Sequence, residues 1–208
     1  MVEKKPNFII IGAMKAATTS LYTYIKQHPD IFMTKVKEPM FFNNFNQNTD
    51  FKVLGNKSKK VNSLLDYFSM FSSVENESAI GEASPSYIYN ENAPHLIKEH
   101  LPDVKIIAIL RQPTDRAYSN FLHTKRADRE NVNSFEQAIK IEKERISDNW
   151  SPLYHYIQKG FYSVQLKRYY NLFPKENIKV YLFEDVVKTP KETLKDIFKF
   201  LNVDENIE

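Results

Sequence analysis

Cysteine is absent from the 208 residues of the chain. Its absence excludes disulfide bonds and thiolate metal sites. The five histidines lack the paired spacing of zinc ligands, so we expect no metal site. The sequence also lacks a run of the roughly 20 apolar residues that a bilayer span requires. We therefore expect no membrane-spanning segment.

The sequence also lacks a large excess of either positive or negative charge. The sequence has 29 basic and 26 acidic residues, a formal net charge of +3. This mild excess does not indicate a nucleic-acid partner, although it suits a protein that holds an anion locally. Charged residues make up 26% and hydrophobic residues 42%, which is not a disordered composition and is enough for one buried core. We expect one domain over residues 1–208.

The N-terminus combines basic residues with a short apolar run. The run covers five positions, residues 8–12, and is too short for the core of a signal peptide. We interpret it as a first strand. The expected location of the protein is therefore a cytosol of bacterial type, that is, cytoplasmic.

Short apolar runs alternate along the chain with helical patterns. We predict strands at residues 8–11, 31–34, 79–83, 104–110 and 178–183. We predict helices at residues 18–27, 63–72, 93–100, 114–125, 135–146, 163–172 and 191–201. The Asn-rich segment 41–60 is predicted to be a loop. This alternation predicts an α/β fold, with a mostly parallel sheet and helices on both of its faces.

Ligands of such sheets bind beyond the carboxyl ends of the strands. The segment that follows the first predicted strand is residues 12–20, GAMKAATTS. A strand, a glycine turn and a helix start that Thr18, Thr19 or Ser20 can cap together form a cradle for an anion. Lys15 adds a positive charge. The spacing differs from that of the nucleoside-triphosphate P-loop, GxxxxGK[ST]. By itself the segment could also be an ordinary strand–helix turn.

A second segment of this kind begins at the end of the predicted strand 104–110 and covers residues 110–119, LRQPTDRAYS. Arg111 follows the clearest strand, Thr114 or Asp115 opens a helix, and Ser119 lies about two turns along it. A guanidinium and a hydroxyl can bind a second phosphate, because arginine offers paired N–H donors. The alternative is a salt-bridged arginine with a surface serine, and this segment alone favours that alternative.

The third segment of interest is residues 35–42, KVKEPMFF. Glu38 is a carboxylate between basic and aromatic residues and can act as a general base. The alternative is a solvated loop glutamate, which is the commoner case for a lone residue of this kind.

Together these segments resemble the family of PAPS-dependent sulfotransferases, especially the carbohydrate branch related to heparan sulfate sulfotransferases. GAMKAATTSL is similar to the family's 5′-phosphosulfate loop, and RQPTDRAYSNFLH to its 3′-phosphate motif. KEPMFF is similar to the segment that carries the catalytic glutamate. GEASPSYI at residues 81–88 is similar to the next strand-end motif, and GFYSVQLKRYYNLFP followed by IKVYLFEDV to a later helix–strand pair. The five matches occur in the family's order and imply its P-loop-like form of the sheet.

The resemblance implies sulfuryl transfer from PAPS to a hydroxyl or amine of an acceptor. Lys15 would contact the sulfuryl group and the bridging oxygen, and so stabilise charge on the departing phosphate. Glu38 would take the proton from the acceptor. His123 matches a histidine that assists catalysis in the N-sulfotransferase branch, although it could also be a plain helix residue. The chemistry needs positioning and charge stabilisation, and it requires no metal.

The resemblance also implies which residues bind PAPS. Besides Lys15, which would bind PAPS at the sulfuryl group, those expected to hold the 5′-phosphate are Ala16, Ala17, Thr18 and Thr19. Arg111 and Ser119 would hold the 3′-phosphate, which distinguishes PAPS from other adenosine nucleotides.

Three departures from the family's pattern affect these expectations. Ala17 replaces the usual loop glycine, which matters if the backbone there needs a positive φ. Met40 replaces a histidine found in many relatives, so the only second acid–base group near Glu38 would be His123. The sequence ends at Glu208, where relatives continue with a basic loop that closes over PAPS, so we expect this loop to be lacking.

Two other functions stay open from the sequence. A nucleotide kinase would need Walker spacing and magnesium ligands, and neither is visible. A non-catalytic PAP-binding or PAPS-binding module would keep the cradle without turnover. The acceptor, a small molecule or glycan, is not readable, and neither is the oligomeric state. Aromatic residues that could stack on sugar rings, each of which could also belong to the core, are Phe41, Phe42, Tyr87, Tyr89, Trp150, Tyr154 and Tyr162.

Overall fold

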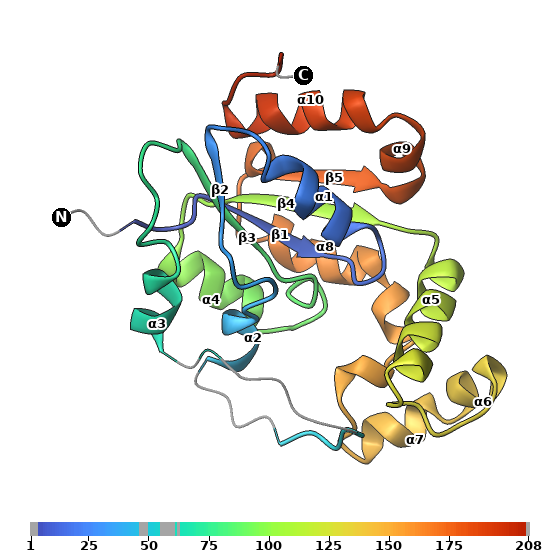
Figure 1. Ribbon diagram of the computed structural model, residues 1–208. Coiled ribbons are helices and arrows are strands. Elements are labelled where there is room, and N and C mark those ends of the chain that lie inside the picture. The colour runs from blue at the N-terminus through green and yellow to red at the C-terminus, as the bar shows by residue number, and fades with distance from the viewer. Residues whose placement is uncertain (1–3, 46–49, 55–60, 62, 207–208) are drawn as a thin grey trace.

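A parallel sheet lies at the centre of the computed structural model, which describes residues 4–45, 50–54, 61 and 63–206 (Figure 1). The five strands, in spatial order, are β2 (Ile31–Met33), β3 (Ala79–Ala83), β1 (Phe8–Gly12), β4 (Lys105–Leu110) and β5 (Ile178–Leu182). Every neighbouring pair is parallel. All carboxyl ends therefore lie at one edge of the sheet, as the sequence predicted for a ligand site of this fold class.

Apolar runs form the middle of the sheet because both faces are covered. Every residue of β1 and of β3 is buried. Gly81 of β3 lies beside Phe8 of β1, and a Cβ atom at Gly81 would collide with the Phe8 ring. The glycine is therefore needed for the close pairing of these two strands.

Helices cover the two faces in separate groups (Figure 1). On one face lie α1 (Thr18–Ile25) and α10 (Pro190–Leu201), and on the other lie α3 (Leu64–Ser69), α4 (Ala93–His100) and α8 (Tyr162–Tyr170). The His28 ring after α1 packs edge-on against Phe198 of α10, with ring centroids 4.7 Å apart. On the opposite face, the hydroxyl of Tyr169 in α8 donates to the Tyr87 carbonyl oxygen over 3.0 Å. The predicted covering of both faces is thus confirmed.

Helix α5 (Pro113–Arg126) leads away from the end of β4 toward α6 (Phe135–Lys140) and α7 (Glu142–Ser147) (Figure 1). Residues of α5 and α6 form a small second core with Tyr156; its buried members are Ala117, Phe121, Ala138 and Tyr156. The remaining helices are α2 (Phe41–Asn44), α9 (Phe183–Lys188) and three short 3₁₀ turns, η1 (Pro152–Tyr154), η2 (Gln158–Gly160) and η3 (Lys175–Asn177).

The structure corrects two predicted elements. Residues 41–44 form a helical turn instead of a loop, because Phe41 and Phe42 are wholly buried in the core. Residues 46–49 and 55–60 of that predicted loop lie outside the described residues. The single helix predicted at residues 135–146 is broken at Ile141 into α6 and α7. Just after the break, the buried Glu142 carboxylate accepts hydrogen bonds from the N–H groups of Ile157 and Gln158, at the start of the 3₁₀ turn η2.

The predicted side-chain cap of the first helix is wrong as well, and the helix after β4 starts one residue earlier than predicted. Helix α1 begins at Thr18 after Ala17, and no side chain caps it. Helix α5 begins at Pro113, and the Gln112 side chain accepts from the Asp115 N–H over 2.8 Å. The other predicted elements agree with the structure to within a few residues at their ends. None of the helices in the described residues is long and apolar enough to cross a bilayer.

Candidate active site

The loop between β1 and α1, residues 12–19, forms the centre of the site; we call it the phosphate loop. Lys15 and Ala17 adopt left-handed backbone angles, with φ of 67° and 62°. Such angles cost a residue with a Cβ atom roughly 1–2 kcal/mol. Ala17 therefore bears the cost that the family's glycine avoids. Because no side chain caps α1, its first N–H groups remain available to an anion.

Arg111 is held against the phosphate loop from the end of β4. Its Nη1 donates to the Lys15 carbonyl oxygen over 3.3 Å, and its guanidinium lies 4.6 Å from the centroid of the Phe183 ring. The hydroxyl of Tyr162 donates to the Arg111 carbonyl oxygen over 2.9 Å. The buried Nε of Arg111 has no hydrogen-bond partner among the described residues. Ser119 is half-buried in α5, the helix that begins two residues after Arg111.

Glu38 lies on the segment between β2 and α2. Its backbone φ is 57°, and its N–H donates to the Ala83 carbonyl oxygen over 3.2 Å. The carboxylate accepts from Lys37 Nζ over 2.8 Å, and about a third of the side chain is exposed. Two residues later the Met40 N–H donates to Ser84 Oγ over 3.0 Å. The end of β3 therefore fixes the backbone that carries Glu38.

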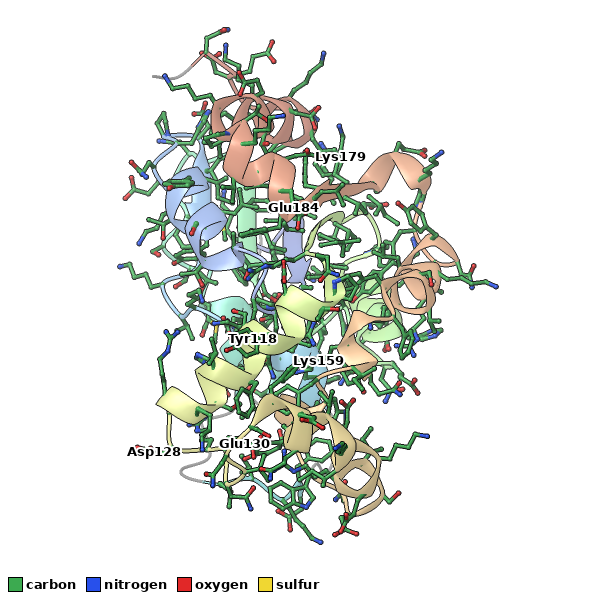
Figure 2. All side chains as sticks on the ribbon, turned by 90° about the vertical axis from the view of Figure 1, so that its right-hand side faces the viewer. Tyr118, Asp128, Glu130, Lys159, Lys179 and Glu184 are labelled. Carbon is green, nitrogen blue, oxygen red and sulfur yellow. The ribbon has the colours of Figure 1, made fainter. Side chains whose placement is uncertain are left out.

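The electrostatic interactions show that three separate segments meet at the site. Burial lowers the pKa of Lys15, Arg126 lowers it further, and Glu38 opposes both effects. Burial also lowers the pKa of His123, with Lys15 as the next cause and Glu38 again opposing. The charged groups of Lys15 and Glu38 thus act on each other and on the His123 ring, which places these three side chains in one region of the structure. Figure 2 shows the helix that carries His123, α5, across the front of the molecule.

A buried carboxyl group supports the Glu38 segment from behind, and we did not identify it from the sequence. Glu82 of β3 is wholly buried, its Oε2 accepts from Ser84 Oγ over 2.8 Å, and its Oε1 accepts from the Tyr67 hydroxyl over 3.3 Å. Burial raises the pKa of Glu82 to about 7, despite the opposing hydrogen bonds. A glutamate within an otherwise apolar strand was the signal that could have revealed it.

Several residues suggested for sugar stacking belong to the core instead. Phe41, Phe42, Tyr87 and Tyr154 are wholly buried. Tyr89, Trp150 and Tyr162 are half-buried. The sequence could not separate the two groups, because aromatic residues are common both in cores and at binding sites. Within the described residues, no three or more His, Asp or Glu side chains are grouped as metal ligands.

Comparison with known proteins identifies the family. Residues 5–208 match the sulfotransferase domain family. The chain is 24% identical over 275 residues to membrane-associated sulfotransferase kil1 of Dictyostelium discoideum, an alignment that covers 95% of this chain and 56% of that protein. It is 27% identical over 203 residues to bifunctional heparan sulfate N-deacetylase/N-sulfotransferase 3 of Homo sapiens, covering 97% of this chain and 23% of that protein. The chain therefore spans only part of these curated relatives.

A solved structure supports the same assignment. The sulfotransferase from Alicyclobacillus acidocaldarius is 36% identical and superposes with a TM-score of 0.93. The alignment covers 98% of this chain and 83% of that one. Together with the match over residues 5–208, this similarity shows that the chain belongs to the sulfotransferase family of transferase enzymes.

Proposed function

We propose that the protein transfers a sulfuryl group from PAPS to a hydroxyl or amine of a carbohydrate acceptor. The observation that carries the proposal is the meeting of Lys15, Glu38 and His123 beside the phosphate loop. A cation, a carboxylate and an imidazole from three segments supply the charge stabilisation and proton transfer that the reaction needs.

The residues of the site fit the donor nucleotide. The 5′-phosphate would bind the backbone of Ala16 and Ala17 and the start of α1 at Thr18 and Thr19, since uncapped helix N–H groups favour an anion. Arg111 has a buried Nε without a partner among the described residues, and with Ser119 it would hold the 3′-phosphate. When bound, PAPS supplies the activated sulfuryl group.

Glu38 takes the proton in the proposed reaction. As the acceptor oxygen or nitrogen loses its proton to Glu38, it forms a bond to sulfur. The bond from sulfur to the bridging oxygen breaks, and its electron pair leaves with the 5′-phosphate, where Lys15 stabilises the charge. Lys37 contacts the Glu38 carboxylate and orients it before the acceptor binds. His123 assists at the acceptor.

The surroundings of the site favour a polar or acidic acceptor. Lys35 and Arg126 are exposed, and Arg126 is near enough to lower the pKa of Lys15. The name of the human relative includes heparan sulfate, an acidic glycan. A carbohydrate acceptor, a single domain and a cytoplasmic location stay predictions.

Transfer and binding can be tested separately. Calorimetry with PAP measures binding to the donor site, and transfer of label from PAPS to a panel of glycans and small alcohols or amines measures turnover. We expect saturable PAP binding and labelled carbohydrate products without added metal. PAP binding without transfer to any acceptor would favour a binding module. Absence of PAP binding would contradict the assigned donor site, and transfer of phosphate from ATP would favour a kinase.

A further inference from the structure

A small cavity lies under the start of the phosphate loop. Its wall includes Ala13 and Met14 of the loop and three polar side chains, Arg116, Lys159 and Gln165. The cavity has room for about one water-sized particle. Its polar wall residues take no part in the transfer chemistry proposed above.

Arg116 contributes a charge that is completely shielded from solvent. The side chain is 0% exposed, and its Nη2 donates to the Tyr156 carbonyl oxygen. Its Nε and Nη1 have no hydrogen-bond partner among the described residues. Burial lowers the pKa of Arg116, but a guanidinium titrates so high that it stays charged at neutral pH. Buried N–H donors of this kind call for an acceptor.

Lys159 brings a second cation to the same wall. It is 5% exposed, and Figure 2 shows it beside helix α5, which carries Arg116. Its Nζ contacts Met14 Sδ at 3.2 Å and lies 5.8 Å from the centroid of the Tyr89 ring. A thioether sulfur is only a weak acceptor. Burial lowers the pKa of Lys159 to about 7, and repulsion from Arg116 is the next cause. The ammonium would be stabilised by a negative neighbour.

Glu142 is the carboxylate that acts on both Arg116 and Lys159, but its oxygens already accept hydrogen bonds from backbone N–H groups. Glu142 is buried, and its two oxygens accept from the N–H groups of Ile157 and Gln158 over 2.7 and 3.0 Å. It raises the pKa of both cations, but in neither case is it the largest cause. With Lys159 protonated, two positive charges face one negative charge in a buried region, and this imbalance favours an anion.

We propose that the cavity binds one monatomic anion of the size of chloride, held by Arg116 and Lys159. Sulfate and phosphate have five heavy atoms and do not fit the volume of a single water-sized particle. A water molecule fits the volume and could also donate to Gln165 Oε1, which is buried without a partner in the described residues. With Lys159 protonated, a water molecule leaves one positive charge in the cavity unbalanced, whereas a halide ion balances it. The anion would also fix Met14, and with it the entry to the phosphate loop.

Bromide provides a direct probe of the cavity. Crystals grown or soaked in sodium bromide should show an anomalous peak between Arg116 and Lys159. In solution, chloride should raise the unfolding temperature in a saturable manner compared with gluconate at equal ionic strength, because gluconate is too large to enter. Electron density in the cavity no stronger than that of a water molecule, with no anomalous peak at saturating bromide, would overturn the proposal.

A matched pair of variants tests whether Lys159 is responsible for the effect of chloride on the unfolding temperature. Lys159→Met keeps the approximate volume of the side chain and removes its charge, so this variant should fold and lose the difference between chloride and gluconate. Lys167→Met, at an exposed position of α8, should keep the difference. Retention of the chloride effect in Lys159→Met would overturn the proposal. PAP binding and transfer need not be intact for this result, so it does not depend on the proposed function.

Discussion

The guanidinium of Arg111 donates a hydrogen bond from Nη1 to the carbonyl oxygen of Lys15, over 3.3 Å. The bond joins the end of β4 to the phosphate loop after β1, two neighbouring strands of the sheet. Each residue belongs to a different part of the expected donor site, Lys15 at the 5′-phosphate and Arg111 at the 3′-phosphate. In the proposed donor complex, this contact would set the spacing between the two phosphates.

Replacement of Arg111 should reveal which phosphate it recognises. We expect Arg111→Ala to weaken PAP by about 10- to 100-fold, because hydrogen bonds to charged groups contribute about 1.5–3 kcal/mol. Adenosine 5′-phosphosulfate, which lacks the 3′-phosphate, should be affected far less. Arg111→Lys should recover only part of the loss, since an ammonium lacks the paired donors. Calorimetry with both nucleotides measures the difference, and equal losses would contradict the assigned role.

Replacement of Lys15 or Glu38 should reduce turnover far more than PAP affinity. We expect Lys15→Ala and Glu38→Gln each to lower kcat by about 10²–10⁴-fold, the usual range for loss of a charge-stabilising or proton-accepting group. Single-turnover transfer assays and PAP calorimetry measure the two effects. Lys195→Met, at an exposed position of α10 to which no role in the site is assigned, serves as the control. A Glu38→Gln protein with wild-type turnover would exclude Glu38 as the base.

The buried Glu82 should make stability depend on pH. Because its folded pKa is raised from 4.5 to about 7, the protonated carboxyl is favoured in the folded state. Its contribution is fully present below pH 4.5 and is lost as the pH rises toward 7, with an upper limit of roughly 3 kcal/mol. Urea unfolding between pH 4.5 and 8 measures it.

Glu82→Gln isolates this contribution, because the amide does not ionise. We expect the variant to show a flatter dependence of unfolding free energy on pH than the wild type. Glu99→Gln, at an exposed position of α4, should retain the wild-type dependence. Two parallel profiles for wild type and Glu82→Gln would show that Glu82 titrates normally in the folded state.

The ion pair between Glu130 and Arg145 should stabilise the region beyond α5 (Figure 2 labels Glu130). The two nitrogens of Arg145 donate to the two oxygens of Glu130 over 2.8 and 2.6 Å, and both side chains are almost fully buried. We expect Arg145→Met to lower the unfolding free energy by about 3–5 kcal/mol, because it leaves a buried carboxylate unpaired.

An exposed pair on α6 provides the matched control for Arg145. Glu136 and Lys140 lie 2.6 Å apart but are about 70% exposed, so Lys140→Met should cost less than about 1 kcal/mol. Denaturant unfolding measures both variants. Burial acts to raise the pKa of Glu130, but bonds from Arg145 and Tyr156 outweigh it and lower the pKa. The contribution of the pair is therefore present at neutral pH and is lost at acid pH.

Most of the fold was readable because it depends on local patterns. The buried strands appear as continuous apolar runs, and β3 and α4 occur with the predicted bounds. Their alternation with helices determines a parallel sheet, and parallel strands place their carboxyl ends together. For this reason Lys15 and Arg111, each just beyond a strand, could be identified as site candidates from the sequence.

The tertiary structure decided the relationships between distant residues. His123 and Glu38 are 85 positions apart in the sequence and meet only because α5 and the segment after β2 reach the same edge of the sheet. The break at Ile141 and the burial of Arg116 were equally unreadable. Periodicity reports which face of an element is apolar. Strand order, burial of a charge and the position of a backbone N–H depend on what the rest of the chain places beside it.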